Sequence, residues 1–108
     1  MKLLIVIVQD SDVNLLMDDL VEQKFSVTKL ATTGGFLREG NTTLLIGVED
    51  DKVDECISLI SGSCKRRQTT TTITNTNEQG PMFQSFPIEI EVGGATIFVL
   101  NVDQFLKL

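Results

Sequence analysis

Residues 2–9 constrain the fold of this chain more than any other segment. Their sequence, KLLIVIVQ, contains six consecutive apolar residues and is rich in β-branched side chains. Because successive side chains of a strand point to opposite faces, this run predicts a β-strand that is apolar on both faces. The run is too short to span a bilayer, and polar residues follow it too soon for a signal peptide. We therefore expect a cytoplasmic protein.

Two amphipathic helices are predicted from apolar residues that recur at spacings of three and four. The first helix follows Ser11 or Asp12, and the second follows Asp50 or Asp51, since these side chains can cap a helix. Gly62 indicates the end of the second helix. The apolar faces consist of Val13, Leu16, Met17, Leu20 and Val21 in the first helix, and Val53, Cys56, Ile57 and Ile60 in the second.

Four further strands are predicted from β-branched and aromatic residues. They cover residues 25–32, 42–48, 87–92 and 95–101. The last two flank Gly93-Gly94, a pair typical of a tight hairpin turn. Residues 102–108 form a short tail for which we expect at most one helical turn.

Residues 65–86 interrupt this pattern. The segment is polar, rich in Thr and Asn, and carries a Gly-Pro pair. It predicts a long flexible loop, or a loop that contains a short hairpin. The element order then gives one domain over residues 1–108. Its fold class is α+β, a ferredoxin-like βαββαβ arrangement with an added C-terminal strand and two helices on one face of an antiparallel sheet.

The second face of this sheet needs a cover. Two helices shield one face, yet residues 2–9, 44–46 and 97–100 are apolar on both. A large exposed apolar face is uncommon in a soluble monomer. The sequence therefore predicts an obligate assembly through the open face.

Composition excludes several classes of function. The chain has 15 acidic and 9 basic residues, a net charge of −6, and no His. An acidic surface argues against nucleic-acid binding and membrane binding. Without His, no Ser or Thr has its usual activating base, and Cys56 and Cys64 alone complete no metal site. We expect no catalytic residues, no metal and no cofactor, and two free thiols.

Charged clusters have simple structural interpretations. The acidic residues coincide with the predicted helix starts, where they complement the helix dipole. Lys65, Arg66 and Arg67 follow the second helix, where they either complement its negative end or contact phosphates. The dipole interpretation is favoured for both clusters.

The segment ATTGGFLREGNTT, residues 31–43, is the best candidate for a site. Gly34 and Gly35 can leave backbone N–H groups free to bind an anion. Phe36 is apolar at the tip of a predicted turn and could stack on a base, and Asn41 offers both a donor and an acceptor. The residues alone leave two possibilities open, a ligand site or a connection that packs on a partner chain.

Several segments together resemble the PII-like cyclic-di-AMP receptor proteins of Gram-positive bacteria. They are Ile7-Val8-Gln9-Asp10, TKLATTGGFLREGNTT (28–43), Gly47, DDKVDE (50–55) and EVGGATIFV (91–99). The resemblance implies a homotrimer of ferredoxin-like subunits that binds cyclic di-AMP in three clefts between subunits. It also implies a non-enzymatic role in signal transduction, with an effector protein that the sequence does not identify.

The resemblance also implies roles for individual residues. Gly35, Phe36 and Leu37 should line one adenine pocket, whose base edge Asn41 should read. Gly47 should leave room for the base.

Thr28 should bond a phosphate and Phe98 should contact the second base. Two other positions depart from the family pattern. Ser26 stands where the family commonly has a phosphate-binding Arg, and Lys107 stands near a usual Gln. The alternatives are therefore a PII-like sensor of ATP or ADP, and a trimeric interaction scaffold without a small ligand.

Overall fold

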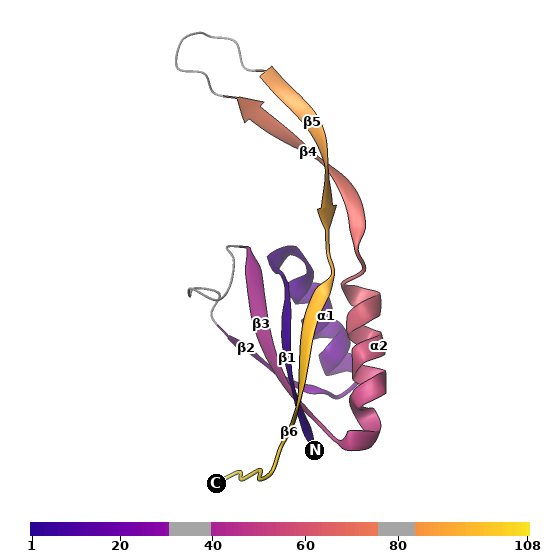
Figure 1. Cartoon of the computed structure of the whole chain (residues 1–108), viewed down its shortest axis with the longest axis vertical. Coiled ribbons are helices and arrows are strands. Elements are labelled where there is room, and N and C mark those ends of the chain that lie inside the picture. The colour runs from indigo at the N-terminus through magenta and orange to yellow at the C-terminus, as the bar shows by residue number, and fades with distance from the viewer. Residues whose placement is uncertain (31–39, 76–83) are drawn as a thin grey trace.

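The computed structural model describes residues 1–30, 40–75 and 84–108, with the backbone alone for 69–75, 84–86 and 88. Figure 1 shows a body of one sheet and two helices from which a long hairpin extends. The elements are β1 (Lys2–Gln9), α1 (Asp10–Glu22), β2 (Ser26–Leu30), β3 (Asn41–Val48), the 3-10 helix η1 (Asp50–Lys52), α2 (Val53–Ser63), β4 (Arg67–Asn75), β5 (Gln84–Val92) and β6 (Ala95–Asn101).

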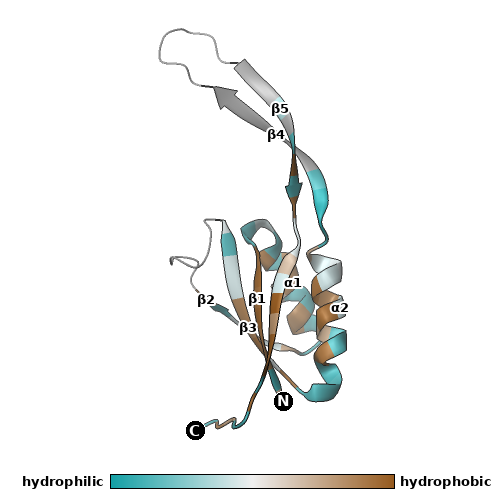
Figure 2. Cartoon of the chain, viewed as in Figure 1, coloured by the Kyte–Doolittle hydropathy of each residue, from teal (hydrophilic) through white to brown (hydrophobic). Residues whose placement is uncertain are grey.

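The body is a four-stranded antiparallel sheet with strand order β2-β3-β1-β6. Both helices cover the same face of this sheet (Figure 1). The core lies between these two layers and consists of Leu4, Val6, Val8, Val13, Leu16, Leu20, Leu44, Ile46, Val48, Cys56, Ile60 and Cys64. Figure 2 shows the apolar character of β1 along most of its length. The predicted ferredoxin-like α+β fold is confirmed.

The prediction of a tight hairpin at Gly93-Gly94 is wrong. β5 pairs with β4, whereas β6 pairs with β1 in the main sheet. Gly93 and Gly94 have φ values of +90° and +84°, and a Cβ atom at Gly93 would overlap the carbonyl oxygen of Lys65. The two glycines thus let the chain pass closely from one sheet to the other.

The added strands are β4 and β5, inserted between α2 and β6, and β6 is the fourth strand of the main sheet. They occupy most of the segment that the sequence predicts to be a loop, of which residues 76–83 lie outside the described residues. The Thr-rich run supports a strand because Thr is β-branched. The polar run shows no apolar alternation from which a strand could be predicted, because a hairpin that leaves the body needs no apolar face toward the core.

The helices begin and end at residues other than those predicted. α1 begins at Asp10 directly after β1, and its N-cap residue Gln9 makes no capping bond with its side chain. η1 precedes α2, which continues through Gly62 to Ser63. The tail, residues 102–108, contains no helical turn.

Both cysteines are free and buried, as predicted. Desolvation raises the pKa of each thiol to about 11, with a smaller contribution from Glu55 at Cys56 and from Asp12 at Cys64. The thiols therefore stay protonated at neutral pH. They act as small apolar side chains of the core.

Lys24, two residues beyond the end of α1, has a backbone conformation that suits glycine better. Its φ is +64°, and the backbone N–H groups of Lys24 and Phe25 donate to the carbonyl oxygens of Val21 and Leu20. Lys24→Gly should therefore raise the free energy of unfolding by about 1 kcal/mol, because a Cβ atom strains this left-handed position. Urea denaturation at one protein concentration measures the change. Lys29→Gly, within β2, is the control and should destabilise the protein instead; a loss of stability in Lys24→Gly would contradict the prediction.

Candidate functional site

The face of the main sheet opposite the helices is apolar at its centre. In the strand register, one row across this face is Thr28, Leu45, Ile5 and Phe98, and a second row is Ser26, Gly47, Leu3 and Leu100. Phe98 is 46% exposed, since neither helix covers this side. The predicted doubly apolar character of β1 is therefore confirmed, and one of its faces lacks a cover within the described chain.

Five predicted site residues share this open face. Because alternate residues of a strand point to the same side, the register assigns all five to it. They are Ser26 and Thr28 on β2, Asn41 and Gly47 on β3, and Phe98 on β6. The resemblance to a family named these five residues, and the strand register adds that they share one face; their roles stay predictions.

Ser26, Thr28 and Gly47 lie together near one edge of the sheet. Ser26 and Gly47 are register partners and line a pocket of about 460 Å³. A Cβ atom at Gly47 would lie 3.1 Å from the Cε atom of Met1, which also lines this pocket, so a larger residue would have to displace the end of Met1. Lys24, Lys52, Glu49 and Glu55 also line the pocket, and Lys52 forms an ion pair with Glu55 at 3.3 Å, so these four charges balance.

Asn41 and Phe98 lie apart from this group. Asn41 is at the opposite end of β3 from Gly47, roughly 20 Å away for six residues of extended strand. Phe98 is on the far edge strand, with β3 and β1 between it and Thr28, which corresponds to roughly 14 Å. One chain therefore presents candidate residues toward the two opposite edges of its sheet.

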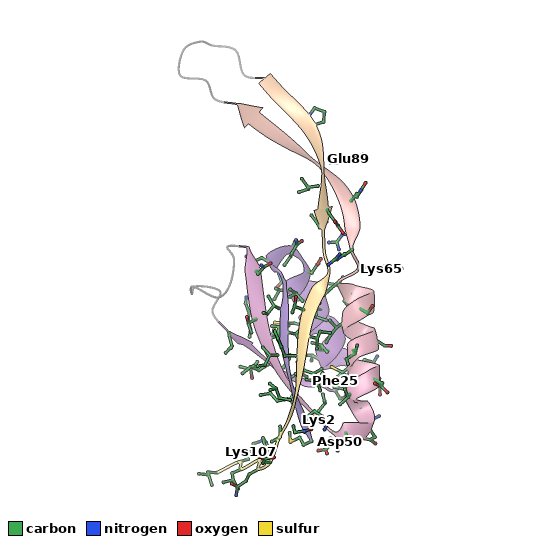
Figure 3. The ribbon with its side chains drawn as sticks, in the orientation of Figure 1. Lys2, Phe25, Asp50, Lys65, Glu89 and Lys107 are labelled. Carbon is green, nitrogen blue, oxygen red and sulfur yellow. The ribbon has the colours of Figure 1, made fainter. Side chains whose placement is uncertain are left out.

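Gly35, Phe36 and Leu37 lie outside the described residues, and their roles stay predictions. Lys107 is exposed on the tail. Figure 3 shows it at the same end of the body as Lys2 and Asp50, the end opposite Lys65 and the hairpin.

The sequence missed an ion pair at the base of the hairpin. Arg67 donates from Nη2 to Oδ1 of Asp12 at 2.6 Å, and Asp12 is only 3% exposed. The hydrogen bond and the charge of Asp12 raise the pKa of Arg67. Arg67 thus belongs to β4 and to this pair, and its predicted role at the helix dipole is wrong. No local signal could have revealed a pair that is separated by 55 residues in sequence.

Asn41 lines a second, smaller pocket of about 160 Å³ at the hairpin end of the body. Its other lining residues include Gln9, Arg66, Gly93 and Gly94. This pocket and the pocket at Ser26 lie at opposite ends of β3.

The described residues contain neither a cluster of metal ligands nor a membrane-spanning helix. Residues 1–30, 40–75 and 84–108 contain no group of three or more His, Cys, Asp or Glu side chains that could hold a metal ion. In the same part of the chain, no helix has the length and apolar character needed to cross a membrane.

Comparisons with known proteins agree with this fold. The structure is similar to the crystal structure of a functionally unknown protein from Pediococcus pentosaceus ATCC 25745, with a TM-score of 0.76 and 43% sequence identity over 99% of this chain and 96% of the other. A family model described as cyclic-di-AMP receptor matches residues 1–108. Because this match covers the whole chain, the protein belongs to the cyclic-di-AMP receptor family, a PII-like family of signalling proteins.

Proposed function

We propose that this protein is a non-enzymatic signal-transduction receptor that binds cyclic di-AMP in clefts between the subunits of a homotrimer. One observation carries the proposal. The described candidate residues share one open apolar face but lie toward its two opposite sides, with Ser26 and Thr28 on the edge strand β2 and Phe98 on the edge strand β6. A cyclic assembly that brings the β2 edge of one copy beside the β6 edge of the next would cover the face and complete each cleft.

The side chains in such a cleft fit the chemical groups of the nucleotide. The Thr28 hydroxyl can donate to a phosphate oxygen, and Phe98 offers an aromatic face to a base. Lys24 and Lys52 line the pocket at Ser26 and Gly47, but Lys52 pairs with Glu55 at 3.3 Å and Glu49 also lines the pocket. The side chains of this pocket therefore have no net positive charge that would replace an arginine at Ser26.

Isothermal titration with cyclic di-AMP, cyclic di-GMP, ATP and ADP tests the proposal, with the oligomer confirmed by sedimentation. We expect heat from cyclic di-AMP at one site per subunit. Heat from ATP or ADP alone would instead support a PII-like sensor of another nucleotide. No heat from any of the four, with a folded trimer, would favour the scaffold.

Asn41→Ala is expected to weaken cyclic di-AMP binding by roughly tenfold or more, because an adenine edge would lose its hydrogen-bond partners. Phe36→Ala should also weaken binding, through loss of a base contact. Titration of each variant measures the change, and sedimentation should show an intact oligomer. Asn14→Ala is the matched control, since Asn14 is exposed on α1 in the helix layer. Unchanged affinity in both site variants would show that the adenine pocket lies elsewhere.

A further inference from the structure

The junction of β1 and α1 touches the beginning of β3. We call residues 9–12, the last residue of β1 and the first three residues of α1, the Gln9–Asp12 turn. The backbone N–H of Asp10 donates to the carbonyl oxygen of Gly40 at 2.8 Å, and the Thr42 hydroxyl donates to the Asp10 carboxylate. Asn41, the candidate base-reading residue, lies between these two contacts and is the register partner of Gln9. A shift of Asn41 would therefore reach the turn directly.

The same turn also holds the base of the hairpin. The backbone N–H of Gly93 donates to Oε1 of Gln9 at 2.8 Å. Three residues further on, Asp12 accepts the 2.6 Å hydrogen bond from Arg67, the first residue of β4. Both strands of the hairpin are thus connected to the Gln9–Asp12 turn. Gly93, which follows β5, bonds the Gln9 side chain, and Arg67 in β4 forms an ion pair with Asp12.

The base of the hairpin packs closely at both contacts. Gly93 has a positive φ, and a Cβ atom there would overlap the carbonyl oxygen of Lys65, so only glycine lets the chain pass this close. Asp12 is buried, and its Oδ2 atom has no hydrogen-bond partner in the described residues. Release of Arg67 would leave a buried carboxylate without its partner, which is strongly unfavourable. The hairpin base therefore follows the turn when the turn moves.

We propose that the Gln9–Asp12 turn couples the candidate nucleotide cleft to the β4–β5 hairpin, with Gln9 as the positioning residue. The proposal rests on the proposed function, because it describes how occupation of that cleft changes another part of the molecule. A nucleotide that contacts Asn41 shifts the start of β3 and its register partner Gln9. The amide of Gln9 then carries the shift to Gly93 and so to the end of β5.

The first experiment needs no nucleotide. Thr42→Val removes the hydroxyl that contacts Asp10, and amide hydrogen exchange by NMR follows the Gly93 N–H group. We expect exchange at Gly93 to become about tenfold faster, the effect of one weakened hydrogen bond. In Gln9→Met, exchange should already be fast, and added Thr42→Val should change it no further. Thr43→Val, one residue along and on the opposite face of β3, is the control and should leave Gly93 unchanged.

The second experiment adds cyclic di-AMP, with saturation of every variant verified by titration. In the wild type, amide exchange of β4 and β5 should change on binding. Gln9→Met should lose this response, whereas Gln9→Glu should retain it because its carboxylate keeps an oxygen acceptor for Gly93. Gln68→Met is the matched control, since Gln68 is exposed on β4.

Each outcome decides between the two proposals. A full hairpin response in saturated Gln9→Met, or unchanged Gly93 exchange in Thr42→Val, would overturn the coupling and leave the receptor function intact. No binding of cyclic di-AMP by the wild type would overturn the receptor function. The Thr42→Val result alone would then support or overturn the link between the start of β3 and Gly93, without a nucleotide to use it.

Discussion

Ile5→Asp is expected to dissociate the assembly into folded monomers. Ile5 lies in the middle of the open face, between Leu45 and Phe98 in the strand register. In an assembly that covers this face, the new carboxylate would be buried without a partner, at a cost of several kcal/mol. In a monomer the same side chain faces water, so the fold should persist. We expect the dissociation constant of the assembly to rise by roughly a thousandfold, which corresponds to about 4 kcal/mol.

Sedimentation velocity at micromolar concentration measures this effect, and circular dichroism checks the fold. Leu15→Asp is the matched control, because Leu15 is 56% exposed on α1 in the helix layer. It introduces the same charge in place of a similar side chain and should leave the assembly intact. If Ile5→Asp sediments like the wild type, the open face is not the interface, and the intersubunit cleft loses its basis.

Ser26→Arg is expected to tighten cyclic di-AMP binding by roughly ten- to a hundredfold. A hydrogen bond to a charged group contributes about 1.5–3 kcal/mol, and each 1.4 kcal/mol is a factor of ten in affinity. Ser26 is exposed at the β2 edge and lines the pocket beside Gly47. Since arginine can bind a phosphate through two parallel hydrogen bonds, this position suits it better than serine.

Calorimetric titration at low and high salt measures the gain, which should shrink as salt screens the charges. Ser61→Arg is the control, because Ser61 is exposed on α2 and the variant adds the same charge far from the open face. Equal tightening in both variants would indicate a general effect of net charge. Unchanged affinity in Ser26→Arg would show that this position does not contact the phosphates.

The candidate residues came from the resemblance to a family, whereas strand periodicity, which is local, predicts only the face on which each of them lies. The alternation in each strand assigns Thr28, Gly47 and Phe98 to a face once the apolar side toward the helices is known. Their separation was not predictable, because it depends on which strands form the two edges. The order β2-β3-β1-β6 moves Phe98 to the edge opposite Thr28, and this arrangement gives the partner subunit its role in the proposed cleft.

The sequence by itself determined the fold class and the need for a cover on the open face. Six consecutive apolar residues in β1 require burial on both sides, and two amphipathic helices can supply only one. Only the tertiary structure decided whether Gly93-Gly94 forms a tight hairpin turn or a crossing between two sheets. Positive φ suits a tight turn and a crossing between two sheets equally, so the residues cannot distinguish them. The difference comes from the carbonyl oxygen of Lys65 and the side chain of Gln9, which reach Gly93 from distant parts of the chain.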